Sequence, residues 1–145
     1  MNPLTLERVY PYAWGALAAG FVLILDARGY RVSYSDGMLS SVISLGGIFS
    51  GFLATIKTLL LTVAVDVKRR LHETGYINPL LSYLKEGIAG SLLLCLIAMF
   101  GFDGAMASCV AHAAFIYGLL LFSLAALYRI TVIAFYLLSS KGDDE

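Results

Sequence analysis

The sequence predicts an all-α integral membrane protein built as a bundle of four helices. The run from Met38 to Ile56 contains no charged side chain, and it is long enough to span the roughly 30 Å hydrocarbon core of a bilayer. Three further apolar segments accompany it. The chain is 59% hydrophobic and only 14% charged, whereas soluble domains carry about 25% charged residues.

Turn formers and interfacial residues set the expected boundaries. Aromatic residues open the first segment, as is typical of a membrane interface. Ser35 or Asp36 is expected to cap the second helix, and Asn78 followed by Pro79 predicts the start of the third. The expected helices cover about residues 9–25, 38–71, 79–102 and 104–138. The remaining segments form an outer loop (26–37), a cytoplasmic basic loop (66–78) and a polar tail (139–145) of one transmembrane domain.

Basic residues are distributed unequally between the two sides of the predicted bundle. Only Arg28 and Arg31 fall on the side of the outer loop. The opposite side carries Arg8, Lys68, Arg69, Arg70, Lys85 and Lys141. Because basic residues accumulate on the cytoplasmic side of membrane proteins, both termini are predicted to be cytoplasmic.

Small residues recur at helical spacing on three of the expected helices. They allow the close backbone approach that drives helix association in lipid. The second helix carries Ser40, Ser44, Gly47, Gly51, Ala54 and Thr58, the fourth carries Ala107, Ala111, Ala114 and Gly118, and the first carries Gly15, Ala16, Ala19 and Gly20. These stripes pack either within one chain or against a second copy. Several stripes on four short helices favour a homo-oligomer.

Two cations stand out at the ends of uncharged runs. Lys57 and Arg129 each follow a full-length apolar segment and precede further apolar residues. One interpretation is that both side chains reach lipid phosphates at the interface. The other is that they form a ring of positive charge in an oligomeric channel, which would favour the passage of anions. Ser50 and Thr58 are candidate polar residues of the same passage.

Other functional classes find little support in the sequence. His112 follows Cys109 by three residues, but two ligands are too few for a metal site. We expect His112 to be a hydrogen-bonded core residue. No catalytic arrangement or phosphate-binding loop is present, so neither an enzyme nor a cofactor is predicted. Zero net charge gives no reason to expect direct contact with nucleic acid. The basic loop with Lys68, Arg69 and Arg70 sets topology, contacts anionic lipid or docks a cytosolic partner.

A set of short motifs around the second helix resembles a known type of membrane protein. These motifs are Gly37-Met38-Leu39-Ser40-Ser41, Lys68-Arg69-Arg70-Leu71 and Gly75-Tyr76, within residues 37–83. They resemble the RexB-like proteins of phage exclusion, and small four-span proteins also occur as the membrane component of Kiwa-type defence systems. The resemblance implies a bacterial inner-membrane protein of phage defence. Such a protein is expected to act either by depolarising the membrane once a cytosolic partner senses infection, or as a sensor or scaffold for a cytosolic antiviral effector.

Overall fold

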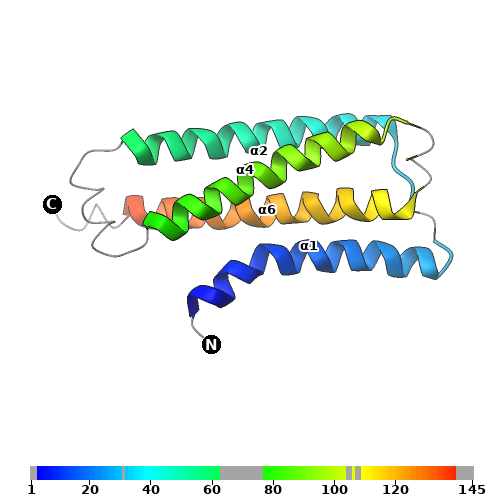
Figure 1. Cartoon of the computed structure of the whole chain (residues 1–145), viewed down its shortest axis with the longest axis horizontal. Coiled ribbons are helices and arrows are strands. Elements are labelled where there is room, and N and C mark those ends of the chain that lie inside the picture. Colours follow the sequence, from blue (N-terminus) through cyan, green and yellow to red (C-terminus); the bar gives the residue numbers. More distant parts are fainter. Residues whose placement is uncertain (1–2, 31, 63–76, 104–105, 107–108, 140–145) are drawn as a thin grey trace.

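The computed structural model describes residues 3–30, 32–62, 77–103, 106 and 109–139, and the described part of the chain contains helices and no strands (Figure 1). The helices are α1 (Pro3–Ala27), α2 (Asp36–Thr62), α4 (Ile77–Phe100) and α6 (Val110–Ser139). Each contains a stretch long and apolar enough to cross a membrane. The predicted fold class, an all-helical bundle with four candidate spans, is therefore confirmed.

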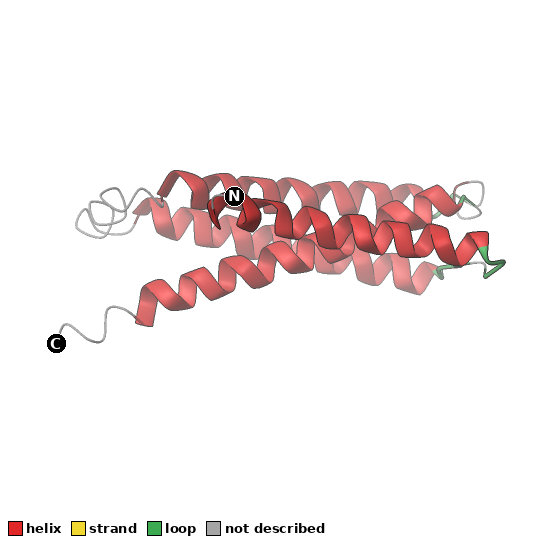
Figure 2. Cartoon of the chain, turned by 90° about the horizontal axis from the view of Figure 1, so that it is seen from below, coloured by secondary structure: helices red, strands yellow, loops and turns green. Residues whose placement is uncertain are grey.

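Successive helices run in alternating directions along one long axis (Figures 1 and 2). The start of α1 and the end of α6 lie at one end of the bundle, here called the terminal end (Figure 1). The connections from α1 to α2 and from α4 to α6 lie at the other end, here called the hairpin end. The first and last helices thus begin and end at the same end of the bundle.

The helices pack in the order α1, α6, α4, α2, as a row rather than a closed square. The principal contacts are α1 with α6, α6 with α4, and α4 with α2, and α2 touches α6 only slightly. Helix α6 lies inside this row, and 39% of its candidate span is buried, against 11% for α1. Helices α1 and α2 therefore form the two edges of the row, each with a broad face that no other described helix covers.

Apolar side chains fill the space between the three best-packed helices. One cluster near the hairpin end brings together residues of α2, α4 and α6, and a second lies near the terminal end. The first comprises Leu39, Val42, Leu94, Ala98 and Ile116, and the second comprises Leu53, Leu84 and Ile130. Because α4 contributes to both clusters, it holds α2 and α6 together along most of their length.

Glycines set the closest approaches between helices. A Cβ on Gly46 would lie 2.5 Å from Cys95 Sγ, so α2 and α4 meet closely there. A Cβ on Gly90 would lie 2.5 Å from the ring of Phe122. Gly15 and Gly118 face each other across the α1–α6 crossing, where each would place a Cβ 3.0 Å from the carbonyl oxygen of the other. Larger side chains at these positions would separate the helices.

Local signals at the first connection explain where α1 ends and α2 begins. Gly29 adopts a φ of 86°, which favours glycine, and the Tyr30 N–H donates to Leu25 O at 3.0 Å, the bond expected when a helix ends in a Schellman motif. Ser35 caps α2 because its Oγ accepts a hydrogen bond from the Met38 N–H at 3.3 Å. Of the two expected caps, the structure selects Ser35.

Several helix boundaries differ from those expected. Helix α1 begins at Pro3, so Pro11 lies inside it, and Figure 1 shows the first turns of α1 bent away from the bundle; an internal proline removes a backbone donor and kinks a helix. Helix α4 begins at Ile77, which places Asn78 and Pro79 in its first turn. Residues 63–71 of the expected second helix lie outside the described residues.

The fourth helix also begins later than expected, at Val110 rather than at residue 104. Hydrogen bonds of the tighter i to i+3 type run from the Met106 N–H to Asp103 O and from the Cys109 N–H to Met106 O. Cys109 consequently precedes the helix instead of sharing a helical face with His112. The uncharged, apolar pattern that predicted the fourth helix begins at residue 104 and continues through this turn. The turn could therefore not be predicted from that pattern.

Candidate functional sites: the outer face of α2 and two polar clusters

A continuous strip of small and hydroxyl-bearing residues lies on the outside of α2. We call it the outer face of α2. It comprises Ser40, Ser44, Gly47, Gly51, Ala54, Thr55 and Thr58, all of which are exposed. A Cβ added to Gly47 or Gly51 would meet no atom within 4 Å. The predicted small-residue stripe of this helix is therefore exposed, with open space at both of its glycines.

The opposite side of α2 makes the intrachain contacts. Leu39, Val42, Phe49 and Leu53 are buried there, and Gly46 lies against α4. Gly46 and Gly47 are neighbours in sequence but point about 100° apart on a helix. Packing within the chain thus uses Gly46, while the GxxxG pair singled out from the sequence points away from the bundle.

The hydroxyl groups on the outer face of α2 donate to the helix's own backbone. Ser44 Oγ donates to Ser40 O at 2.9 Å, Thr55 Oγ1 to Gly51 O at 2.9 Å, and Thr58 Oγ1 to Ala54 O at 3.0 Å. These bonds satisfy the donors, so the face can lie against lipid at low cost. Each oxygen keeps further acceptor capacity that points outward.

Two predicted channel residues lie on a different side of α2. Residues four apart share a face of a helix. Lys57 therefore lies on the face of the buried Leu53, and Ser50 lies on the face of Gly46. Both side chains are half-buried. Lys57 and Ser50 thus flank the outer face of α2 on the side of α4, whereas Thr58 belongs to the outer face itself.

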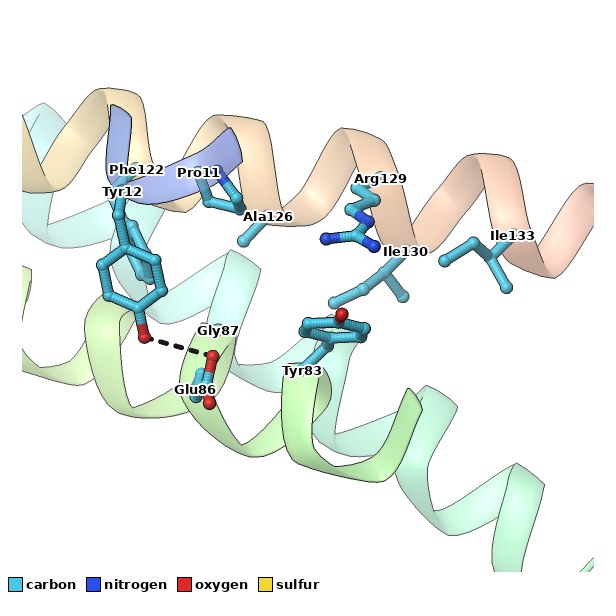
Figure 3. Close-up of a pocket in the computed structure, with 10 residues that line it drawn as sticks. All are labelled: Pro11, Tyr12, Tyr83, Glu86, Gly87, Phe122, Ala126, Arg129, Ile130 and Ile133. Carbon is cyan, nitrogen blue, oxygen red and sulfur yellow. Dashed lines mark hydrogen bonds between the residues drawn. The ribbon is translucent and has the colours of Figure 1, made fainter. Parts of the chain in front are cut away.

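Arg129 lies in a groove at the terminal end, formed by α1, α4 and α6 (Figure 3). Its guanidinium carbon is 4.2 Å from the centroid of the Tyr83 ring, a cation–π contact. Tyr12 Oη donates to Glu86 Oε2 at 3.1 Å across the same groove. We call it the terminal groove; its lining residues are Pro11, Tyr12, Tyr83, Glu86, Gly87, Phe122, Ala126, Arg129, Ile130 and Ile133.

Lys57 and Arg129 lie near the same end of the bundle but in different surroundings. Each is close to the last residue of its candidate span, Leu59 for α2 and Ile133 for α6. Lys57 is not among the residues that line the terminal groove. The structure therefore supports a similar depth for the two cations without bringing them into one site.

The small residues of α6 are largely used inside the chain. Ala114 is buried in a cluster with Val22 of α1, and Gly118 faces Gly15. Ala111 is exposed, and Ala107 lies outside the described residues. On α6 and α1, intrachain packing thus uses part of the small-residue pattern, whereas Ala16 is exposed and a Cβ on Gly20 would meet no atom within 4 Å.

A second polar cluster surrounds His112 at the hairpin end. Its Nδ1 lies 2.5 Å from Tyr34 Oη and its Nε2 lies 2.9 Å from Ile97 O. The ring therefore joins the segment before α2 to α4 and α6. The sequence predicted a hydrogen-bonded histidine, but Tyr34 was missed as its partner because no spacing rule connects two residues so distant in the chain.

The remaining candidates are limited by what the structure describes. Lys68, Arg69 and Arg70 lie outside the described residues. Among the described residues, no group of three histidine, cysteine, aspartate or glutamate side chains is placed to hold a metal ion.

Comparisons of this chain with protein-family models, with curated proteins and with solved structures give no match.

Proposed function

We propose that this chain is a membrane-permeabilising protein that assembles from several copies, with the outer face of α2 lining or sealing the passage. The observation that carries the proposal is the position of the small-residue stripe. On α1 and α6 such stripes meet in part inside the chain, as at Gly15 and Gly118. On α2 the equivalent stripe is exposed along the whole candidate span.

Contact between copies gives this face a physical use. In lipid, helices associate through van der Waals packing of small residues and through hydrogen bonds rather than through the hydrophobic effect. Gly47 and Gly51 leave room for a second helix to approach the α2 backbone. The oxygens of Ser44, Thr55 and Thr58 offer acceptors either to that helix or to water in a passage.

Charge at the terminal end would influence which ions pass. Lys57 flanks the outer face of α2 close to the end of its span, and its side chain is long enough to extend toward an aqueous mouth. A ring of such cations favours anions. Reversal of this charge in Lys57→Glu is expected to shift the preference toward cations while leaving assembly intact.

The biological setting of the proposal rests on the sequence. The basic residues on the side of the termini favour a cytoplasmic terminal end. The resemblance to RexB-like proteins suggests permeabilisation of the bacterial inner membrane during phage infection, after a signal from a cytosolic partner. The basic residues Lys68, Arg69 and Arg70 are the proposed contact for that partner or for anionic lipid.

Flux across liposomes containing the purified protein tests the proposal directly. Gly51→Leu fills the outer face of α2, and Gly20→Leu is a matched control on α1, because a Cβ at either glycine meets nothing within 4 Å. We expect wild-type protein and Gly20→Leu to dissipate an imposed potential, read with a voltage-sensitive dye. Gly51→Leu should reduce the rate at least about tenfold and lower the oligomeric state seen by cross-linking.

The controls separate permeabilisation from the alternative role. If Gly51→Leu and Gly20→Leu dissipate the potential at equal rates, the outer face of α2 takes no part in permeabilisation. Absence of dissipation by the wild-type protein, in liposomes and in infected cells that it still protects, would refute the channel and favour a sensor or scaffold for a cytosolic effector.

A further inference from the structure

The terminal groove combines opposite charges with aromatic rings at one membrane depth. Glu86 and Arg129 stand four to five residues inside the ends of their candidate spans, about 6–8 Å at 1.5 Å per residue. Tyr12 lies at a similar position in the span of α1. Long polar side chains this near the end of a span can extend to the level of the lipid headgroups.

Residues of α1, α4 and α6 enclose the groove. Helix α1 packs on α6, and the Tyr12–Glu86 hydrogen bond links it to α4 across the groove (Figure 3). Pro11 is buried against the groove, and the bend in α1 carries its first turns away from the bundle (Figure 1). The floor is apolar, with Gly87 and Ala126 buried between the helices.

The charged groups of the groove match both charges of a zwitterion. The Arg129 guanidinium carbon lies over the Tyr83 ring, and the planar fork of N–H donors on a guanidinium suits phosphate oxygens. The Glu86 carboxylate accepts hydrogen bonds and is suited to an ammonium group. Tyrosine rings add attraction for a cation.

We propose that the terminal groove binds the headgroup of a phospholipid that carries a primary ammonium, with phosphatidylethanolamine as the representative chemistry. The phosphate lies at Arg129 and the ammonium at Glu86, while the acyl chains extend toward the hairpin end over the exposed apolar side chains of α1 and α4. Such side chains include Leu23 on α1 and Leu93 on α4, which share a helix face with Tyr12 and Glu86 respectively. The proposal is independent of the channel function.

The primary ammonium is the feature that distinguishes this lipid from its relatives. It donates hydrogen bonds to a carboxylate, whereas the quaternary ammonium of phosphatidylcholine donates none. A phosphatidylglycerol headgroup brings no cation for Glu86. Preference for the ethanolamine lipid should therefore depend on Glu86, and retention of any phospholipid should depend on Arg129.

Native mass spectrometry of the full-length protein, equilibrated with equal amounts of phosphatidylethanolamine, phosphatidylcholine and phosphatidylglycerol, tests the assignment. The wild-type protein should retain the ethanolamine lipid about tenfold over the choline lipid, the effect of one charge-assisted hydrogen bond. Glu86→Gln should reduce that ratio toward one. Arg129→Gln should weaken all three lipids, and Lys85→Gln, an exposed neighbour outside the groove, should leave the pattern unchanged.

A measurement on the unmodified protein keeps the test decisive if a variant fails to fold. Ethanolamine lipids with one, two and three N-methyl groups lose their donors stepwise, so retention should fall along that series. Equal retention across the series, or preference for phosphatidylglycerol, would overturn the proposal, and so would a Glu86→Gln variant that is folded and keeps the wild-type preference.

Discussion

Gly46 and Gly47 form a natural pair for testing how tightly the bundle is packed. In Gly46→Ala the new Cβ would lie 2.5 Å from Cys95 Sγ and 3.0 Å from Ser91 O, both below the 3.4 Å lower end of ordinary contact. Rotating Cys95 away would break its hydrogen bond to Ile43 O, and the backbone oxygen of Ser91 cannot rotate away. In Gly47→Ala the Cβ meets nothing within 4 Å.

The difference between the two variants isolates the packing cost. Alanine favours a helix over glycine by roughly 0.8–1 kcal/mol, and this gain is the same at both positions. Overpacking costs about 1–3 kcal/mol, and it applies to Gly46→Ala alone. The free energy of unfolding of Gly46→Ala is therefore expected to be about 1–3 kcal/mol lower than that of Gly47→Ala.

Unfolding followed by circular dichroism in dilute detergent measures this difference without contributions from assembly. Adding Cys95→Ala to Gly46→Ala removes the sulfur and should restore part of the loss, which a double-mutant cycle resolves. The contact with Ser91 O remains, so recovery should be incomplete. If Gly46→Ala unfolds at the same denaturant concentration as Gly47→Ala, the close α2–α4 approach at Gly46 is wrong.

Other contacts make three further outcomes measurable. Ser123 Oγ is buried and has no hydrogen-bond partner among the described residues, so Ser123→Ala should raise the free energy of unfolding by about 1–2 kcal/mol; a loss would contradict the burial. Gly118→Leu should lower the unfolding midpoint by forcing α1 from α6, because its Cβ meets Gly15 O at 3.0 Å; an unchanged midpoint would argue against that crossing. Burial raises the pKa of the Tyr34 hydroxyl above its ordinary 10.0, so the resulting stability is complete below about pH 10 and is lost as the pH rises through the folded-state pKa. Tyr34→Phe loses the contact with His112 at every pH, but its free energy of unfolding should fall less steeply at alkaline pH than that of the wild-type protein. Parallel pH curves for the two proteins would exclude Tyr34 as the source of the alkaline loss of stability.

Hydropathy and local turn signals were enough to predict the broad architecture. Apolar runs of membrane-spanning length identified all four candidate spans, because length and composition alone decide whether a helix suits a bilayer. Ser35 was recognised as a possible cap because capping depends on residues three positions apart. The glycine and serine stripe of α2 was identified correctly as a single face.

The direction of each face required the three-dimensional structure. A helix turns by about 100° per residue, so whether Gly46 or Gly47 meets α4 cannot be decided from glycine content. The contact of Tyr34 with His112 and the bond between Tyr12 and Glu86 join residues more than seventy positions apart. The turn before α6 was missed because its residues continue the apolar pattern of a span.

The arrangement of the helices as a row limits the symmetry of any assembly. A row has two different edges, α1 and α2. If the outer face of α2 meets the same face of a second copy, the interface is isologous, the assembly closes as a dimer and the polar strip is buried. A passage therefore requires a heterologous contact, in which the exposed apolar flank of α2 with Leu45, Ile48 and Phe52 meets a different surface of the next copy. The rotation then closes a ring with the outer faces of α2 directed toward its axis.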